Sequence, residues 1–185
     1  MRIALLLLFF SILTMSCNQK RLNEKKDNNT DTTKRMENSE LSEENDVRKR
    51  QIASLNYEFK SVEYHDLESK IIIDLNGDGI IDTAEFLKEN NKGGIIITDG
   101  KTNEKFKIGL GNNFYGIGDN FDWVEYWGIV KDKSTGEILF NEKDGILGDT
   151  IVTLENPSIV VRKEFVGGGV ITFKKGKYIW IHQSD

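Results

Sequence analysis

One segment of the sequence gathers the side chains that bind hard cations. It reads Asp-Leu-Asn-Gly-Asp-Gly-Ile-Ile-Asp-Thr-Ala-Glu and matches the calcium-loop pattern D-x-[DN]-x-[DN]-G-x5-E at every specified position. A Ca²⁺ ion takes about six to eight oxygen ligands at roughly 2.3–2.6 Å. The pattern therefore predicts a Ca²⁺ site with these ligands: Asp74, Asn76, Asp78, the backbone carbonyl of Ile80, Asp82 and Glu85.

The spacing of these residues explains how one short loop can surround an ion. Asp74, Asn76 and Asp78 alternate, so their side-chain oxygens can turn toward one centre, and the next glycine permits a sharp turn of the backbone. Asp82 then adds an oxygen directly or through water, and Glu85 can close the site with both oxygens. The alternative is a tight turn made by the two Asx-Gly dipeptides alone. We favour the ion, because a turn does not need the further carboxylates.

The loop resembles that of an EF-hand, but the residues around it do not form EF-hand helices. The isoleucine runs 71–73 and 80–81 favour strands instead. Residues 71–87 are more similar to the Asp-rich calcium loops between strands in FG-GAP and VCBS-type surface repeats. That resemblance implies the same ligands up to Asp82, with Glu85 as a sixth candidate that a departing strand can turn away. The motif occurs once, so the resemblance does not extend to a propeller fold.

Composition excludes several other classes of protein. The chain has 185 residues, a formal net charge of −5 and a single cysteine, which rules out a disulfide framework and a Cys-cluster zinc site. A pI near 5.2 argues against nucleic-acid binding, and a mean hydropathy of −0.44 is too polar for a protein with many membrane spans. No Walker or G-x-G-x-x-G pattern is present, so we expect no nucleotide site.

The first 16 residues have the features of a secretory signal peptide. One arginine precedes an apolar run, residues 3–15, that is shorter than the roughly 20 residues a membrane-spanning helix needs. The sequence from Leu13 to Cys17 resembles a bacterial lipoprotein signal, which implies cleavage before Cys17 and a lipid on its sulfur. The protein would then be anchored in the bacterial cell envelope, at the outer membrane or cell surface. An ordinary signal with a chance cysteine, or an uncleaved anchor, is the alternative.

Residues 17–50 are predicted to be the lipidated cysteine and a disordered, charged tether. From residue 18 on, the segment holds nine basic and eight acidic residues and no aromatic one. Such a composition buries too little apolar area to offset the entropy of ordering the backbone. Part of it, residues 37–50, could form a frayed helix, but no apolar stripe would dock that helix.

Residues 51–185 are predicted to form one all-β domain, an antiparallel sandwich or barrel of about 9–11 short strands. Apolar and β-branched runs recur every eight to twelve residues with Gly or Asx punctuation. Asp99-Gly100, Lys175-Gly176 and the glycines 167–169 are expected at turns. The expected strands are residues 55–59, 71–73, 95–97, 105–108, 122–130, 137–140, 150–154, 159–165, 170–173 and 178–182.

Three weaker features keep other functions open. The cluster from Phe114 to Trp127 holds six aromatic residues in fourteen, which suits a glycan-binding surface, although a central strand packed on both faces explains it better. The acidic cluster of Asp119, Asn120 and Asp122 forms a solvated loop or a second ion site. A hydrolase has little support, since His65 and His182 are isolated and no nucleophile motif is present.

The sequence thus predicts a lipid-anchored, calcium-binding envelope protein that serves as a binding or recognition module rather than an enzyme. Its partners would be the membrane, through the lipid on Cys17, and an extracellular or envelope protein or glycan. A glycan-binding module and a hydrolase with an unrecognised site are the alternatives.

The anchor can be tested at Cys17. We expect Cys17→Ser to block processing at that position and to abolish incorporation of labelled fatty acid. Stable anchoring requires two or more acyl chains, because one chain gives only marginal membrane binding. Mass spectrometry of the mature N-terminus checks the site; a different N-terminus with an unmodified Cys17 would contradict the prediction.

Overall fold

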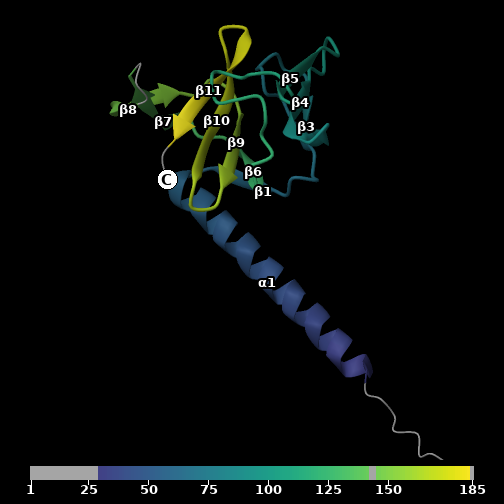
Figure 1. Cartoon of the computed structure of the whole chain (residues 1–185). Coiled ribbons are helices and arrows are strands. Elements are labelled where there is room, and N and C mark those ends of the chain that lie inside the picture. The colour runs from purple at the N-terminus through teal and green to yellow at the C-terminus, as the bar shows by residue number, and fades with distance from the viewer. Residues whose placement is uncertain (1–28, 142–144, 184–185) are drawn as a thin grey trace, which may run out of the picture. The chain divides into compact units, whose positions relative to one another are not determined.

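The protein is represented by a computed structural model that describes residues 29–141 and 145–183, with side chains described from residue 41 onward. The signal segment, Cys17 and residues 18–28 of the predicted tether lie outside the described residues. One helix precedes eleven strands in the described part of the chain (Figure 1). Their bounds are α1 Asn29–Glu58, β1 Val62–His65, β2 Ile71–Ile73, β3 Asp82–Glu89, β4 Lys92–Thr98, β5 Lys105–Gly109, β6 Tyr126–Val130, β7 Ser134–Phe140, β8 Ile146–Thr153, β9 Ser158–Lys163, β10 Gly167–Lys174 and β11 Lys177–Gln183.

The strands form three antiparallel sheets. A five-stranded sheet has the order β1-β6-β9-β10-β11, a four-stranded sheet has the order β2-β3-β4-β5, and β7 and β8 form a separate hairpin. The predicted all-β, antiparallel fold is therefore confirmed. The hairpins at Asp99-Gly100, between β4 and β5, and at Lys175-Gly176, between β10 and β11, are also where the turn residues predict them.

The core lies between the two larger sheets. Alternate residues of β9, Ile159 and Val161, face the four-stranded sheet and pack in one cluster with Ile95 and Ile97 of β4. The intervening Val160 faces the opposite way and packs in a second cluster. The five-stranded sheet is thus covered on both faces, which explains why β6 and most of β9 are buried throughout.

The end of α1 covers the second face of the five-stranded sheet. Leu55 and Phe59, four residues apart, are 1% and 4% exposed and pack in the second cluster, whereas Tyr57 between them is 93% exposed. A spacing of four places two side chains on one side of a helix, while a strand would put all three on the same face. The strand expected at residues 55–59 is therefore wrong.

The helix also extends into the segment predicted as a tether. It begins at Asn29 and is continuous past residue 50. The chain divides into two compact units at residue 40, and the second begins at Leu41, within this helix. Inside the second unit, Arg48 pairs with Asp66 at 3.2 Å and Arg50 pairs with Glu164 at 2.8 Å. These ion pairs, with Leu55, hold the last helical turns against the strands.

Other elements also differ from the sequence prediction. The strand expected at 122–130 begins only at Tyr126, and strands β1 and β3 were not expected. The glycines 167–169 lie inside β10, not in a turn. A Cβ on Gly168 would lie 2.0 Å from the carbonyl oxygen of Val161, and one on Gly169 would lie 2.3 Å from the Trp180 ring. These glycines therefore permit close approach of neighbouring strands, and the turn precedes them.

The docking of α1 can be measured directly. We expect Leu55→Ala to lower the free energy of unfolding by about 2–5 kcal/mol, because it removes a fully buried side chain between helix and sheet. Tyr57→Ala, two residues along the same helix and almost fully exposed, is the matched control and should change stability by less than about 0.5 kcal/mol. Urea denaturation of both variants makes the comparison; equal effects would show that α1 does not dock as described.

Candidate calcium loop

The predicted loop joins two strands. Residues 74–81 lie between β2 and β3, which pair antiparallel, with Ile73 opposite Asp82. The loop is therefore flanked by strands, as the isoleucine runs predicted, and not by helices as in an EF-hand. Glycines at 77 and 79 have φ values of 79° and 85°, a left-handed backbone that other residues rarely adopt.

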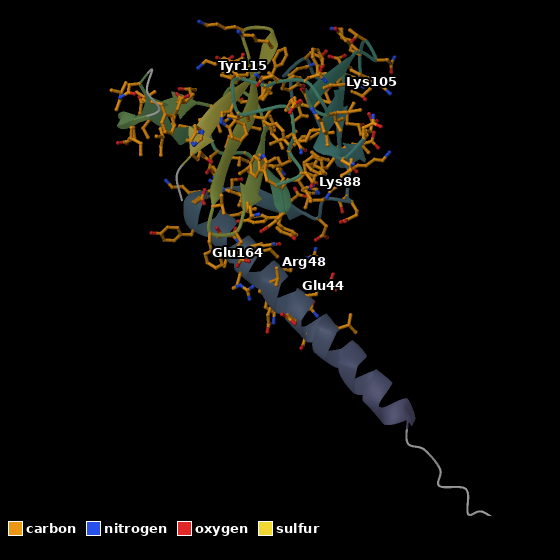
Figure 2. All side chains as sticks on the ribbon, viewed as in Figure 1. Glu44, Arg48, Lys88, Lys105, Tyr115 and Glu164 are labelled. Carbon is orange, nitrogen blue, oxygen red and sulfur yellow. The ribbon has the colours of Figure 1, made fainter. Side chains whose placement is uncertain are left out.

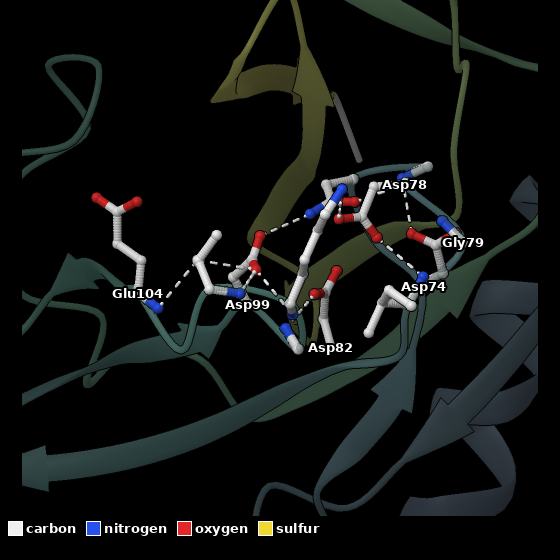
Figure 3. Close-up of polar contacts among 12 residues, drawn as sticks. Asp74, Asp78, Gly79, Asp82, Asp99 and Glu104 are labelled. Carbon is white, nitrogen blue, oxygen red and sulfur yellow. Dashed lines mark hydrogen bonds and ion pairs between the residues drawn. The ribbon is translucent and has the colours of Figure 1, made fainter.

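Side-chain oxygens of the loop bind its own backbone. The two carboxylate oxygens of Asp74 accept hydrogen bonds from the amides of Gly77 and Gly79, at 2.7 and 2.9 Å. Asn76 Oδ1 accepts from the Asp78 amide at 2.9 Å, and Asp78 Oδ1 accepts from the Ile80 amide at 2.8 Å (Figure 3). An oxygen with one hydrogen bond keeps a second lone pair, so these contacts shape the loop and leave acceptors available.

Asp82 is the structural anchor of the loop. Its side chain is fully buried, and its two oxygens accept hydrogen bonds from the Leu75 amide and the Gly100 amide, each at 2.9 Å. Leu75 belongs to the loop, whereas Gly100 belongs to the turn between β4 and β5. One carboxylate therefore ties two distant segments together; Figure 3 shows Asp82 next to Asp99, which belongs to the turn between β4 and β5.

The turn between β4 and β5 contributes a carboxylate that the sequence analysis did not include. Asp99 Oδ2 accepts a hydrogen bond from Asn76 Nδ2 at 2.8 Å, and Asp99 Oδ1 accepts from both the amide and the hydroxyl of Thr102. The two hydrogen bonds from Thr102 lower the pKa of Asp99, and the one from the amide has the larger effect. The sequence assigned Asp99-Gly100 only to a hairpin. Nothing in that dipeptide indicates a contact 23 residues earlier in the chain.

Four carboxylates share one neighbourhood. The phenol of Tyr178, on β11, is buried, and burial is the main cause that raises its pKa far above its usual range. The charges of the surrounding aspartates raise it further; they are Asp82, Asp99, Asp74 and Asp78. The ammonium of Lys101 lies 3.8 Å from Asp78 Oδ2. The loop is therefore a region of concentrated negative charge beside a single lysine contact.

Glu85 is not brought into the loop. It lies three residues into β3, and strand residues an odd number apart face opposite sides, so it does not share the face of Asp82. Its carboxylate pairs with Lys70 at 2.7 Å. Within residues 29–141 and 145–183, no group of three or more His, Cys, Asp or Glu side chains is arranged to hold a metal ion. The remaining predicted ligands must therefore converge further if an ion binds.

The second acidic cluster has other partners. Asp119 pairs with Lys92, Asp122 pairs with Lys88 at 2.6 Å, and Asn120 Oδ1 accepts from the Gly93 amide at 2.8 Å. The hydrogen bond from Lys92 lowers the pKa of Asp119. These residues fasten the segment before β6 to the β3–β4 hairpin, so the arrangement favours a structural role over a second ion site.

The aromatic cluster is split between core and surface. Phe121, Tyr126 and Trp127 are buried, Phe114 and Trp123 are half-buried, and Tyr115 is 50% exposed. Tyr115 and Trp123 line a groove of about 750 Å³ together with Phe140, Trp180 and His182. We call this the aromatic groove. Burial, followed by the charge of Arg162, lowers the pKa of His182. The other histidine, His65, lies 3.5 Å from Glu63 on β1.

Comparison with known proteins identifies no relative. No family model matches the chain, and neither a curated protein nor a solved structure shows significant similarity to it. In the described part of the chain, no helix is both long and apolar enough to cross a membrane.

The role of Asp82 as an anchor gives a stability prediction. Asp82→Asn places an amide donor against one of the two backbone donors, so we expect a loss of roughly 1–3 kcal/mol in the free energy of unfolding, measured in chelator. Glu85→Gln on the same strand is the matched control and should cost less than about 0.5 kcal/mol, since it disrupts only an ion pair with the exposed Lys70. Equal losses would argue against the anchor.

Proposed function

We propose that this protein is a lipid-anchored lipoprotein of the bacterial cell envelope whose β-domain binds one Ca²⁺ in the loop between β2 and β3. The ion would be structural, and the task built on it would be recognition of an extracellular or envelope partner. The proposal of a lipid anchor depends on the residues before Cys17, whereas the proposal of a calcium site depends on the loop.

The observation that carries the calcium proposal is the shared environment of the aspartates. Asp74, Asp78 and Asp82 satisfy the alternate spacing of the motif; Asp74 and Asp78 accept hydrogen bonds from the backbone of one loop, and Asp82 anchors that loop. Repulsion among carboxylates makes such a cluster unfavourable without a cation. Lys101 provides one positive charge at the edge of the loop, and a divalent ion would neutralise more of the cluster.

The donor set suits a hard cation. The candidate ligands are oxygens of Asp74, Asn76 and Asp78, the carbonyl of Ile80, and Asp82 directly or through water. Asp99 would act through Asn76, because it holds the amide nitrogen and thereby leaves Asn76 Oδ1 facing the loop backbone. Glu85 would stay with Lys70. When bound, the ion would neutralise the carboxylates and brace the loop against the β4–β5 turn.

Calcium should raise the melting temperature by a modest amount. Extracellular modules bind calcium with Kd values of about 10⁻⁴–10⁻³ M. At the tight end and at millimolar calcium, the linkage term is about 1.4 kcal/mol, which corresponds to a rise of roughly 3–6 °C. Asp74→Ala combined with Asp78→Ala should abolish the rise. The proposal fails if the wild type melts identically in calcium and chelator and calorimetry detects no heat up to several millimolar.

Two single substitutions then test the ligand assignment. Glu85→Ala should retain most of the calcium-induced rise, since Glu85 is paired elsewhere. Lys101→Ala should tighten calcium binding, because it removes the cation that competes for Asp78. Lys107→Ala, an exposed lysine on the same hairpin, is the control for nonspecific charge effects. Loss of binding in Glu85→Ala would instead indicate a loop that closes as an EF-hand does.

A glycan-binding module is the second candidate, and the aromatic groove is the observation that favours it. Its exposed and half-buried rings come from the segment before β6 and from β7 and β11. Aromatic faces of this kind suit stacking against sugar rings, and the imidazole of His182 and the carboxylate of Glu137 could meet hydroxyl groups.

The glycan alternative predicts a dependence on Tyr115. If a glycan array yields a ligand for the purified full chain, Tyr115→Ala should weaken its binding at least five-fold, because this exposed ring borders the groove. Tyr57→Ala removes a more exposed ring that lies outside the aromatic groove and should leave the affinity unchanged. Equal effects of the two variants, or an array without ligands, would count against this function.

A further inference from the structure

A buried arginine lies on the face of the five-stranded sheet that α1 covers. Arg162 follows Ser158 and Val160 on the helix-facing side of β9, and it is 2% exposed. Its Nη2 atom forms a close ion pair with Glu58, at the end of α1, and donates to Gln183 Oε1 on β11 at 2.7 Å. The guanidinium therefore joins the helix to two strands of the sheet.

Two donor atoms of this guanidinium have no hydrogen-bond partner in the described part of the chain. Within the described residues, the Nε and Nη1 atoms of Arg162 make no hydrogen bond, although both are buried. Burying a charged donor without an acceptor is unfavourable, and native proteins contain few such groups. A planar guanidinium presents its donors in a fixed arrangement, which suits oxygen acceptors. These two donors point to an acceptor supplied by another molecule.

The arginine lies at the wall of a large groove. A cavity of about 970 Å³, open to solvent, is lined by Arg162 and Gln183, by the end of α1, by the β7–β8 hairpin and by the turn between β9 and β10. We call this the α1–hairpin groove. Figure 2 shows Glu164, from that turn, next to α1, consistent with its ion pair to Arg50 at 2.8 Å. The volume is in the range of small-molecule sites, which is about 300–1,000 Å³.

The outer walls of the groove are apolar and accessible. Tyr57 of α1 is 93% exposed, Phe165 of the β9–β10 turn is 88% exposed, and Ile146 of the hairpin is 69% exposed. Phe165 also has a φ of 61°, in the left-handed region that favours Gly or Asn. The groove thus combines apolar side chains at its mouth with polar donors at Arg162, a combination that suits an amphipathic ligand.

We propose that the α1–hairpin groove binds a small molecule with an aromatic or aliphatic body and an oxygen acceptor, either a carboxylate or a carboxamide, which receives hydrogen bonds from Nε and Nη1 of Arg162. The apolar body would lie against Tyr57, Phe165 and Ile146. The groove shares no residue with the loop between β2 and β3, so this site is independent of calcium binding.

Three related probes test the proposal on the full chain. 1-Naphthaleneacetate and 1-naphthaleneacetamide carry an acceptor on the same ring system, whereas 1-methylnaphthalene carries none. We expect at least one of the first two to bind ten-fold more tightly than the third in titrations followed by ¹⁵N NMR, and to shift the Arg162 Nε–H resonance. If 1-naphthaleneacetate binds more tightly than 1-naphthaleneacetamide, the acceptor that the groove prefers is a carboxylate. Equal affinities of the two probes indicate that a carbonyl oxygen is sufficient. Absence of binding, or binding that leaves this resonance unmoved, overturns the proposal.

Two variants test separately the polar donors and the apolar wall of the α1–hairpin groove. Arg162→Gln combined with Glu58→Gln removes both charges of the buried pair and should abolish the ten-fold preference for an acceptor; it also assigns the Nε–H resonance. Phe165→Asn introduces a residue that tolerates the left-handed backbone at this position, so the protein should stay folded. It should lower the affinity for all three probes at least five-fold. Lys49→Gln, at an exposed lysine on α1 that pairs within the helix and does not line the groove, should change neither result. Retained preference in the first variant would show that Arg162 is not the donor.

Discussion

The five-stranded sheet must be covered on both faces, and the rest of the structure depends on this constraint. Its central strands carry apolar side chains in both directions, as in Val160 and Val161, so each face needs a partner layer. The four-stranded sheet covers one face. The other is covered by the last turns of α1 through Leu55 and Phe59. A β-sandwich of this sequence is therefore incomplete without its preceding helix.

The covering layers also determine where polar chemistry can occur. The Asp-rich loop between β2 and β3, the candidate calcium site, lies near β11, where Asp82 joins two turns and Tyr178 is close to the aspartates. The α1–hairpin groove lies on the opposite face of the five-stranded sheet, where Arg162 meets Glu58. Both sites place buried charge at the margin of an apolar layer, where burial strengthens electrostatic interactions and makes unpartnered groups costly.

Local patterns in the sequence predicted most of the strands and the position of the Asp-rich turn between β2 and β3, because those features depend on neighbouring residues. The isoleucine runs at β2 and β4 and the Asp-Gly turn between β4 and β5 needed no distant information. The helix at Leu55 was missed because the spacing Leu55, Tyr57, Phe59 fits a strand as well as a helix, and burial against the sheet decided between them. The contacts of Asp99 with Asn76 and of Arg162 with Glu58 join residues far apart in the chain, and no local pattern could indicate them.

The β7–β8 hairpin has a consequence for communication between sites. Glu137, Ile138 and Gln183 border both the aromatic groove and the α1–hairpin groove, so one small element forms a wall of each. A two-stranded hairpin alone is only marginally stable, and Gln183 of β11 attaches this one through Thr135 and Gly136. If a molecule bound in one groove and fixed the hairpin, it would alter the cost of fixing the hairpin in the other groove. Thermodynamic linkage requires such an effect to be reciprocal, so two ligands would change each other's affinity by the same factor.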